Sequence, residues 1–156
     1  MKDLTKIRAA ISVFVVLLVL SGITAFPLRT EMDFLIVHKN SFPDALARWI
    51  ETVYDAVHKT PDVVLYGTDW LAFAHIIIAL FFVPVYIDPV RYKANLIVAM
   101  TACGAVFLLA FICGPIRGIP FFHQLIDCSF GLIGFFPLYF VFKKISQLER
   151  SKYKMN

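Results

Sequence analysis

The chain has 156 residues, of which 60% are hydrophobic, and its mean hydropathy is +0.76. Soluble domains contain about 45–50% apolar residues, and a domain of this length could not hide so much apolar surface from water, which excludes an ordinary soluble globule. The net charge of +4 comes from basic residues grouped at the termini and in one loop, a pattern typical of membrane topology and not of nucleic-acid binding.

Four apolar runs follow one another along the chain, over about 9–26, 70–87, 94–113 and 120–142. Each is close to the roughly 20 residues that cross a hydrocarbon core about 30 Å thick. Backbone groups in lipid must hydrogen-bond to one another, so each run is expected to form a helix. The sequence therefore predicts an all-α fold, a transmembrane four-helix bundle that occupies a single domain over residues 1–156.

The first run could also be read as the apolar part of a signal peptide, because basic residues precede it. It is long for that purpose, and Thr24-Ala25-Phe26 matches a cleavage site poorly. We expect this helix to be retained.

A polar segment, Pro27–Thr68, separates the first two runs. Within it, Ser41-Phe42-Pro43-Asp44 has the pattern of a helix start with a capping box, and apolar residues then recur at helical spacing until Pro61. This predicts an extra amphipathic helix over about 42–59, lying on the outer membrane surface or capping the bundle. Glu51, Asp55 and His58 share its polar face and could bind a metal, although a solvated charged face is the commoner explanation.

The later helices have recognisable ends. Asp69 is expected to be the N-cap of the second helix, and Asp88-Pro89 to end it. Gly114-Pro115 and Gly118-Ile119-Pro120 predict a tight turn between the third and fourth helices.

Lys and Arg counts predict the orientation. With four spans, both termini and the loop between helices two and three lie on one side, and the positive-inside rule places that side in the cytoplasm. The basic residues on it are Lys2, Lys6, Arg8, Arg91, Lys93, Lys143, Lys144, Arg150, Lys152 and Lys154.

Ionisable residues within apolar runs are the candidates for a functional site, because they are costly to place in a membrane. Helices two and four run in the same direction, so their first turns share one side of the membrane. This brings Asp69, His75, Arg117, His123 and Asp127 into one layer beneath the outer surface. His123 and Asp127 are four residues apart and share a helix face.

We interpret this layer as a polar pocket that opens to the outer face and is roofed by the amphipathic segment. A carboxylate beside an imidazole can support proton transfer, and an arginine suits an anionic group. The alternative is that the same groups pair internally and hold the helices together. The candidate catalytic residues are His123, Asp127 and His75, and the candidate ligand-binding residues are Arg117, Gln124, Asp69 and Trp70.

Four stretches of helices two to four carry a resemblance, over about half of the chain: residues 66–75, 88–91, 114–120 and 125–131. They resemble a family of uncharacterised, small, four-span bacterial inner-membrane proteins. The resemblance implies a multi-pass protein of the bacterial inner (plasma) membrane and implies no activity.

A fainter similarity is to VanZ-like membrane proteins, which carry an Asp and a His at the start of one span and an Arg and an Asp ahead of glycines in the last. Here Asp69 and His75 are further apart than in that family, and Phe130 stands before Gly131 in place of the usual Asn. No residue role is transferred from it.

Three functions are compatible with these features. The first is a non-enzymatic protein of the lipid bilayer that binds a lipid-like or small amphiphilic ligand or serves as a subunit of a membrane complex. The second is an enzyme that acts on a lipid-linked substrate by His/Asp acid–base chemistry. The third is a metal or haem carrier with His75 and His123 as ligands. An ion pathway is disfavoured because the intramembrane acids occupy one leaflet, and no cofactor or nucleic-acid partner is expected.

Overall fold

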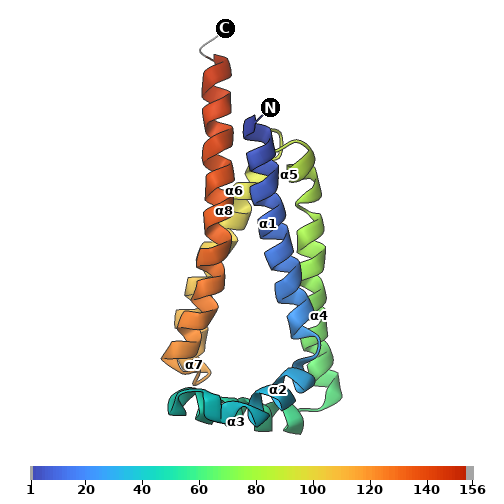
Figure 1. Cartoon of the computed structure of the whole chain (residues 1–156), viewed down its shortest axis with the longest axis vertical. Helices are drawn as coiled ribbons and strands as arrows, with labels where there is room; N and C mark the ends of the chain where they lie inside the picture. Colours follow the sequence, from blue (N-terminus) through green and yellow to red (C-terminus); the bar gives the residue numbers. More distant parts are fainter. Residues whose placement is uncertain (1, 154–156) are drawn as a thin grey trace. The chain divides into compact units, whose positions relative to one another are not determined.

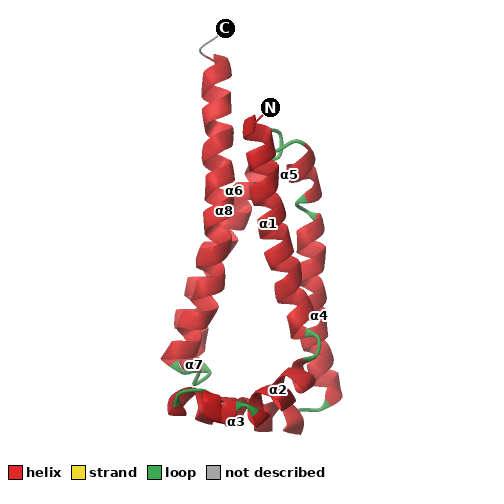
Figure 2. Ribbon diagram, viewed as in Figure 1, coloured by secondary structure: helices red, strands yellow, loops and turns green. Residues whose placement is uncertain are grey.

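The computed structural model describes residues 2–153, and this part of the chain is helical with no strand (Figures 1 and 2). It agrees with the predicted all-α class. Lys154, which entered the prediction of orientation, lies outside the described residues. The elements are α1 (Lys2–Ala25), α2 (Leu28–Val37), η1 (Lys39–Ser41), α3 (Asp44–Lys59), α4 (Asp62–Leu80), α5 (Val83–Ile87), α6 (Lys93–Leu108), the π-helical turn η2 (Leu109–Cys113), α7 (Gly114–Ile116) and α8 (Phe121–Tyr153).

Four helical stretches are long and apolar enough to cross a membrane: Asp3–Ala25, Asp62–Ile87, Lys93–Ile116 and Phe121–Arg150. Their number and order confirm the four predicted spans. Many of their large apolar side chains are exposed, as expected where lipid, rather than protein, covers them. The chain therefore has the properties of a multi-pass membrane protein.

The second span begins earlier than the sequence indicated. α4 starts at Asp62, directly after Pro61, and this acid lies in the first turn, where the helix dipole favours a negative charge. Asp69 lies inside α4, so its prediction as the N-cap was wrong. The polar residues before it do not interrupt the helix, because the Thr68 hydroxyl donates a hydrogen bond to the Leu65 carbonyl at 2.6 Å.

The chain forms two compact units. The first unit, residues 1–17 and 79–156, contains the N-terminal part of α1 together with α5, α6, α7 and α8. The second unit, residues 18–78, contains the C-terminal part of α1, the helices α2 and α3, and most of α4.

Close packing of α6 against α8 organises the first unit, and Figure 1 shows these two helices side by side. A Cβ atom at Gly131 of α8 would lie 2.6 Å from the Cys103 carbonyl oxygen of α6, which is closer than carbon and oxygen can approach. At Gly134 it would lie 3.3 Å from both the Cys103 sulfur and the Phe14 ring. Glycine at these positions lets the two backbones approach, as small residues do in membrane helix pairs.

Apolar side chains, both aromatic and aliphatic, form the core of the first unit. The rings of Phe14 and Phe82 pack with centroids 4.8 Å apart and connect α1 to the end of the second span. Burial of this kind gains dispersion contacts in a membrane, where lipid tails already solvate apolar groups. The largest fully buried side chains are Ile7, Ile11, Val85, Leu96, Leu138, Val141 and Ile145.

Polar contacts join three chain segments at one end of the first unit. Lys144 of α8 bonds to Asp3 of α1 at 3.2 Å, and Lys93 of α6 forms an ion pair with Glu149 of α8 at 2.6 Å. Arg8 donates to the Tyr86 carbonyl at 3.2 Å, so a cation satisfies the C-terminal end of α5. The N-terminal, 88–93 and C-terminal segments therefore meet at the same end.

The tight turn predicted between the third and fourth spans is present. Gly118 adopts φ +69°, a left-handed conformation that glycine takes without a Cβ clash. The Ile119 amide donates to the Gly114 carbonyl at 2.9 Å and closes the turn. The far end of the second span is also interrupted, since α4 ends at Leu80 and α5 begins just before Pro84.

In the second unit, α2 and α3 pack against each other as a helical hairpin. We name α2, η1 and α3 together the hairpin (residues 28–59). The sequence predicted a helix only from about residue 42, so α2 was missed. The predicted capping box was wrong: Ser41 lies in η1, Pro43 occupies the N-cap position of α3, and no side chain caps that helix. The buried core of the hairpin is Met32, Ile50 and Val57, with Leu28, Leu35, Ile36, Phe42, Leu46, Val53, Tyr54 and Leu65 packed around it.

The C-terminal part of α1 packs against α4 at Gly22. A Cβ atom there would lie 2.7 Å from the Ala72 carbonyl oxygen and 2.9 Å from the Cβ of His75. This close approach fixes the level of His75 relative to α1.

Candidate functional site

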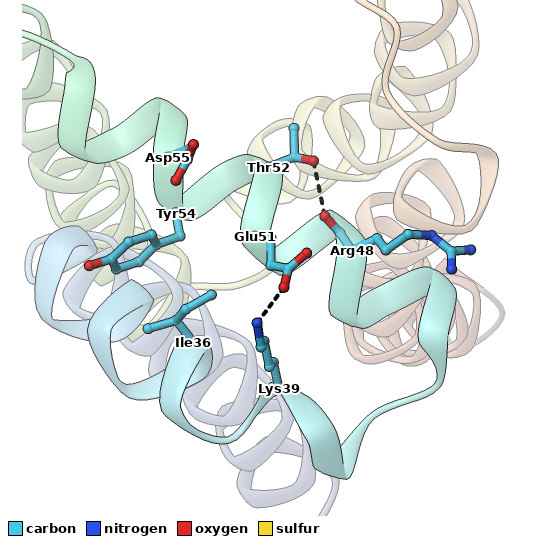
Figure 3. A pocket seen from close by; sticks show the side chains of 7 residues that line it. All are labelled: Ile36, Lys39, Arg48, Glu51, Thr52, Tyr54 and Asp55. Atoms are coloured by element: carbon cyan, nitrogen blue, oxygen red, sulfur yellow. Dashed lines mark hydrogen bonds and ion pairs between the residues drawn. The ribbon is translucent and has the colours of Figure 1, made fainter.

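The hairpin carries a shallow hollow of about 610 Å³ on its polar side (Figure 3). Ile36 and Tyr54 supply apolar lining, and the remaining lining is polar or charged. A lining that combines apolar and charged side chains suits an amphiphilic molecule better than a purely polar one. The residues that line it are Ile36, Lys39, Arg48, Glu51, Thr52, Tyr54 and Asp55.

Most charged groups of the hollow already have partners. Lys39 forms an ion pair with Glu51 across the hairpin, as Figure 3 shows. Lys59 donates to Asp55 at 2.8 Å, and this hydrogen bond, followed by the charge of Lys59, lowers the pKa of the Asp55 carboxyl. The exposed Asp55 is therefore ionised over a wide pH range, with its charge compensated.

Arg48 differs from its neighbours in the hollow. Its carbonyl accepts a hydrogen bond from the Thr52 hydroxyl at 2.9 Å, but no carboxylate pairs with its guanidinium in the described part of the chain. Figure 3 shows this side chain extending away from the Lys39–Glu51 pair. An exposed guanidinium with no acid partner is the group of this hollow that can bind an anion through two parallel hydrogen bonds.

Glu31 lies in α2 of the same hairpin and outside the predicted spans. Partial burial raises the pKa of its carboxyl, because low-dielectric surroundings disfavour the charged form. The ionised carboxyl destabilises the folded hairpin. The stability of the hairpin therefore falls as the pH rises through the folded-state pKa of Glu31.

The metal site considered on α3 does not form. Asp55 pairs with Lys59 and Glu51 with Lys39, whereas His58 contacts Asp33 of α2 at 3.1 Å. Within residues 2–153, no three His, Cys, Asp or Glu side chains lie close enough together to hold a metal ion. The shared polar face of α3 therefore makes ion pairs.

His123 and Asp127 lie one turn apart on α8 in the first unit. The imidazole Nε2 is 3.8 Å from the Asp127 Oδ1, at the outer limit of an ion pair and longer than a hydrogen bond. Both side chains are partly exposed. They share a helix face, as the spacing predicted.

Gln124, the neighbour of this pair, is buried, with 4% of its surface exposed. Its amide nitrogen donates to the Ile119 carbonyl at 2.8 Å, and its side chain packs against Gly114, where a Cβ atom would lie 2.8 Å away. The amide therefore holds the turn between η2 and α8. Arg117 lies in that turn with its side chain exposed.

The remaining candidates lie on α4, in the second unit. Trp70 is exposed and meets Tyr66 edge to face, with centroids 6.1 Å apart. His75 Nδ1 lies 2.8 Å from the Leu71 carbonyl, so in the tautomer that donates this bond Nε2 is left as an acceptor. Asp69 is partly buried and precedes His75 by six residues on the same helix.

The candidate residues thus fall into two groups. Asp69, Trp70 and His75 lie on α4 of the second unit, and Arg117, His123, Gln124 and Asp127 lie around the start of α8 in the first. None of them lines the hollow of the hairpin.

Comparison with models of known protein families, with curated proteins and with solved structures gives no match to this chain. The function of the chain is therefore inferred from its own residues.

Sequence reasoning missed the hollow. It identified the charged face of α3 but predicted no helix between Pro27 and Ser41, so α2, which forms the other side of the hollow, was not foreseen. The available signal was the spacing of Leu28, Met32, Leu35 and Ile36, which is that of one helical face.

Proposed function

We propose that this chain is a non-enzymatic, multi-pass membrane protein that binds a small amphiphile with an anionic group in the hollow of the hairpin. The observation that carries the proposal is the exposed Arg48 guanidinium in a partly apolar hollow whose other charged groups are paired. An anionic group would bind Arg48, and an apolar portion would lie against Ile36 and Tyr54.

We place the hairpin on the outer side of a bacterial inner membrane that the chain crosses four times, with both termini in the cytoplasm. Two facts support this arrangement. The N-terminal, 88–93 and C-terminal segments meet at one end of the first unit, and they carry the larger share of the basic residues. The resemblance to small bacterial four-span proteins supports the same compartment. Labelling of Asn40→Cys in intact cells with a membrane-impermeant maleimide, compared with the wild type, which carries only the native free cysteines, would test the placement.

Arg48→Gln is expected to weaken binding of an anionic amphiphile at least about tenfold. A hydrogen bond to a charged group contributes about 1.5–3 kcal/mol, and each 1.4 kcal/mol corresponds to tenfold in affinity. The measurement is calorimetric titration of the full chain, in phosphatidylcholine nanodiscs, with dihexanoyl phosphatidic acid. Dihexanoyl phosphatidylcholine serves as the zwitterionic probe, and the loss should be confined to the anionic one.

Arg117→Gln is the matched control, because it removes an exposed arginine outside the hollow, the one that the sequence made a candidate for an anionic group. It should leave the affinity within about twofold of the wild type. Loss of binding in Arg117→Gln with Arg48→Gln unchanged would contradict the proposal and favour the turn before α8. If neither probe binds the wild type, the alternative of a subunit in a membrane complex is preferred.

A second candidate is an enzyme for a lipid-linked substrate, favoured by one observation: His123 and Asp127 stand 3.8 Å apart on a predicted span. In that case Asp127 would orient His123 for proton transfer. Asp127→Asn should then reduce turnover at least about 100-fold while leaving the melting temperature unchanged, since general acid–base catalysis contributes about 10²–10⁴-fold. A variant that loses stability and keeps its ligand binding identifies the pair as a structural contact, and the enzyme candidate fails.

A further inference from the structure

The polar end of α8 carries a groove that the proposed function does not use. α8 has 33 residues and is therefore about 50 Å long, which exceeds a hydrocarbon core of roughly 30 Å. Its apolar run ends at Phe142, and the helix continues to Tyr153. The last turns therefore pass through the headgroup region of one leaflet and beyond it, whichever way the protein is oriented.

A shallow groove of about 290 Å³ follows one face of this region. Its residues recur at intervals of three and four, so they form a single stripe along the helix. The stripe changes character along its length, from aromatic at the end of the apolar run to polar and basic beyond it. The lining residues are Tyr139, Phe142, Lys143, Ser146, Gln147 and Arg150.

The groove carries positive charge without a compensating acid. The nearby acids are engaged on other faces: Asp3 bonds to Lys144 at 3.2 Å, and Glu149 pairs with Lys93 at 2.6 Å. Among residues 2–153, no carboxylate pairs with Lys143 or Arg150. The hollow of the hairpin is different, since its lining holds two acids beside its two bases.

The position of these groups matches a phospholipid in the surrounding leaflet. Tyr139 is half exposed and stacks on Phe135, with centroids 5.8 Å apart, so its ring is held at the level where the apolar run ends. Lys143 lies one turn further on and Arg150 about 10 Å beyond Lys143, at the depth of the headgroups. We propose that this groove, Tyr139 to Arg150 on α8, binds the headgroup of an anionic phospholipid, with Lys143 and Arg150 contacting its phosphate.

The double variant Lys143→Gln/Arg150→Gln tests this inference separately from the proposed function, because it lies in the other unit from the hairpin. The full chain is purified in mixed micelles of phosphatidylglycerol and phosphatidylcholine, and the lipids it retains are counted by native mass spectrometry. The wild type should retain phosphatidylglycerol preferentially. In the variant, the preference for phosphatidylglycerol over phosphatidylcholine should fall at least about fivefold. One basic residue near an anionic surface contributes about 1 kcal/mol, which corresponds to about that factor.

The control is Lys6→Gln/Arg91→Gln, which removes the same charge from exposed side chains at the same end of the first unit but outside the groove. It should change the preference less than about twofold. An equal loss of the preference in both double variants would mean that the total positive charge at this end of the first unit attracts the lipid. The groove would then not be a binding site, and the proposal would be wrong. No preference in the wild type, or displacement of the lipid by inorganic phosphate, also overturns the proposal.

The variant Lys143→Arg/Arg150→Lys keeps both positive charges. It tests the groove even if the Gln variant fails to fold. It should retain the preference for phosphatidylglycerol. Loss of the preference in this variant would show that side-chain shape, and not charge, decides retention, and the proposal would be wrong.

Discussion

Gly131→Ala is expected to lower the melting temperature of the detergent-solubilised chain by about 2–12 °C. Its new Cβ atom would lie 2.6 Å from the Cys103 carbonyl oxygen, a backbone atom that cannot move by a side-chain rotation. α6 and α8 would have to separate, and overpacking of this kind costs about 1–3 kcal/mol. For a chain of this size each kcal/mol shifts the melting temperature by roughly 2–4 °C.

Gly104→Ala is the matched control, because it adds the same methyl group to α6 at a position with open space around the new atom. It should leave the melting temperature unchanged or raise it slightly, since alanine is a better helix former than glycine by about 1 kcal/mol. Both variants can be followed by circular dichroism during heating. Equal melting temperatures for Gly131→Ala and the wild type would contradict the close approach of α6 and α8.

The four spans could be predicted from the sequence because their signal is local. Each apolar run of about 20 residues has only one stable conformation in lipid, whatever the rest of the chain does. The turn at Gly118 was predictable for a similar reason, since Gly-Pro and Gly-x-Pro sequences restrict the backbone directly.

The boundaries at the membrane surface were less predictable. Asp69 and Asp62 both have the chemistry of a helix start, and the sequence offers no local way to choose between them. The choice depends on tertiary contacts of the first two turns, such as the packing of Leu65 against the core of the hairpin. Ser41 does not cap α3, because it belongs to the short helix η1, which ends before α3 begins.

The candidate site was predictable in composition more than in arrangement. The spacing of His123 and Asp127 put them on one helix face, and they do share it. The hollow of the hairpin depends on how α2 packs against α3, and Lys39 and Glu51 are 12 residues apart in sequence. The lack of an acid partner for Arg48 is likewise a property of the fold, because Asp44, one turn earlier on α3, would have been an equally reasonable partner on spacing alone.

Gln124→Ala is expected to lower the melting temperature by about 2–12 °C and to leave binding of the anionic probe to the hairpin unchanged. The sequence made this residue a ligand-binding candidate, but it is 4% exposed and donates to the Ile119 carbonyl at 2.8 Å. Its removal leaves that carbonyl without its partner and a gap beside Gly114, which costs about 1–3 kcal/mol. Gln147→Ala, an exposed glutamine on the same helix, should melt like the wild type. A Gln124→Ala chain with wild-type melting and lost binding would instead make Gln124 a ligand contact, because a residue that only holds the turn cannot affect the probe without affecting the fold.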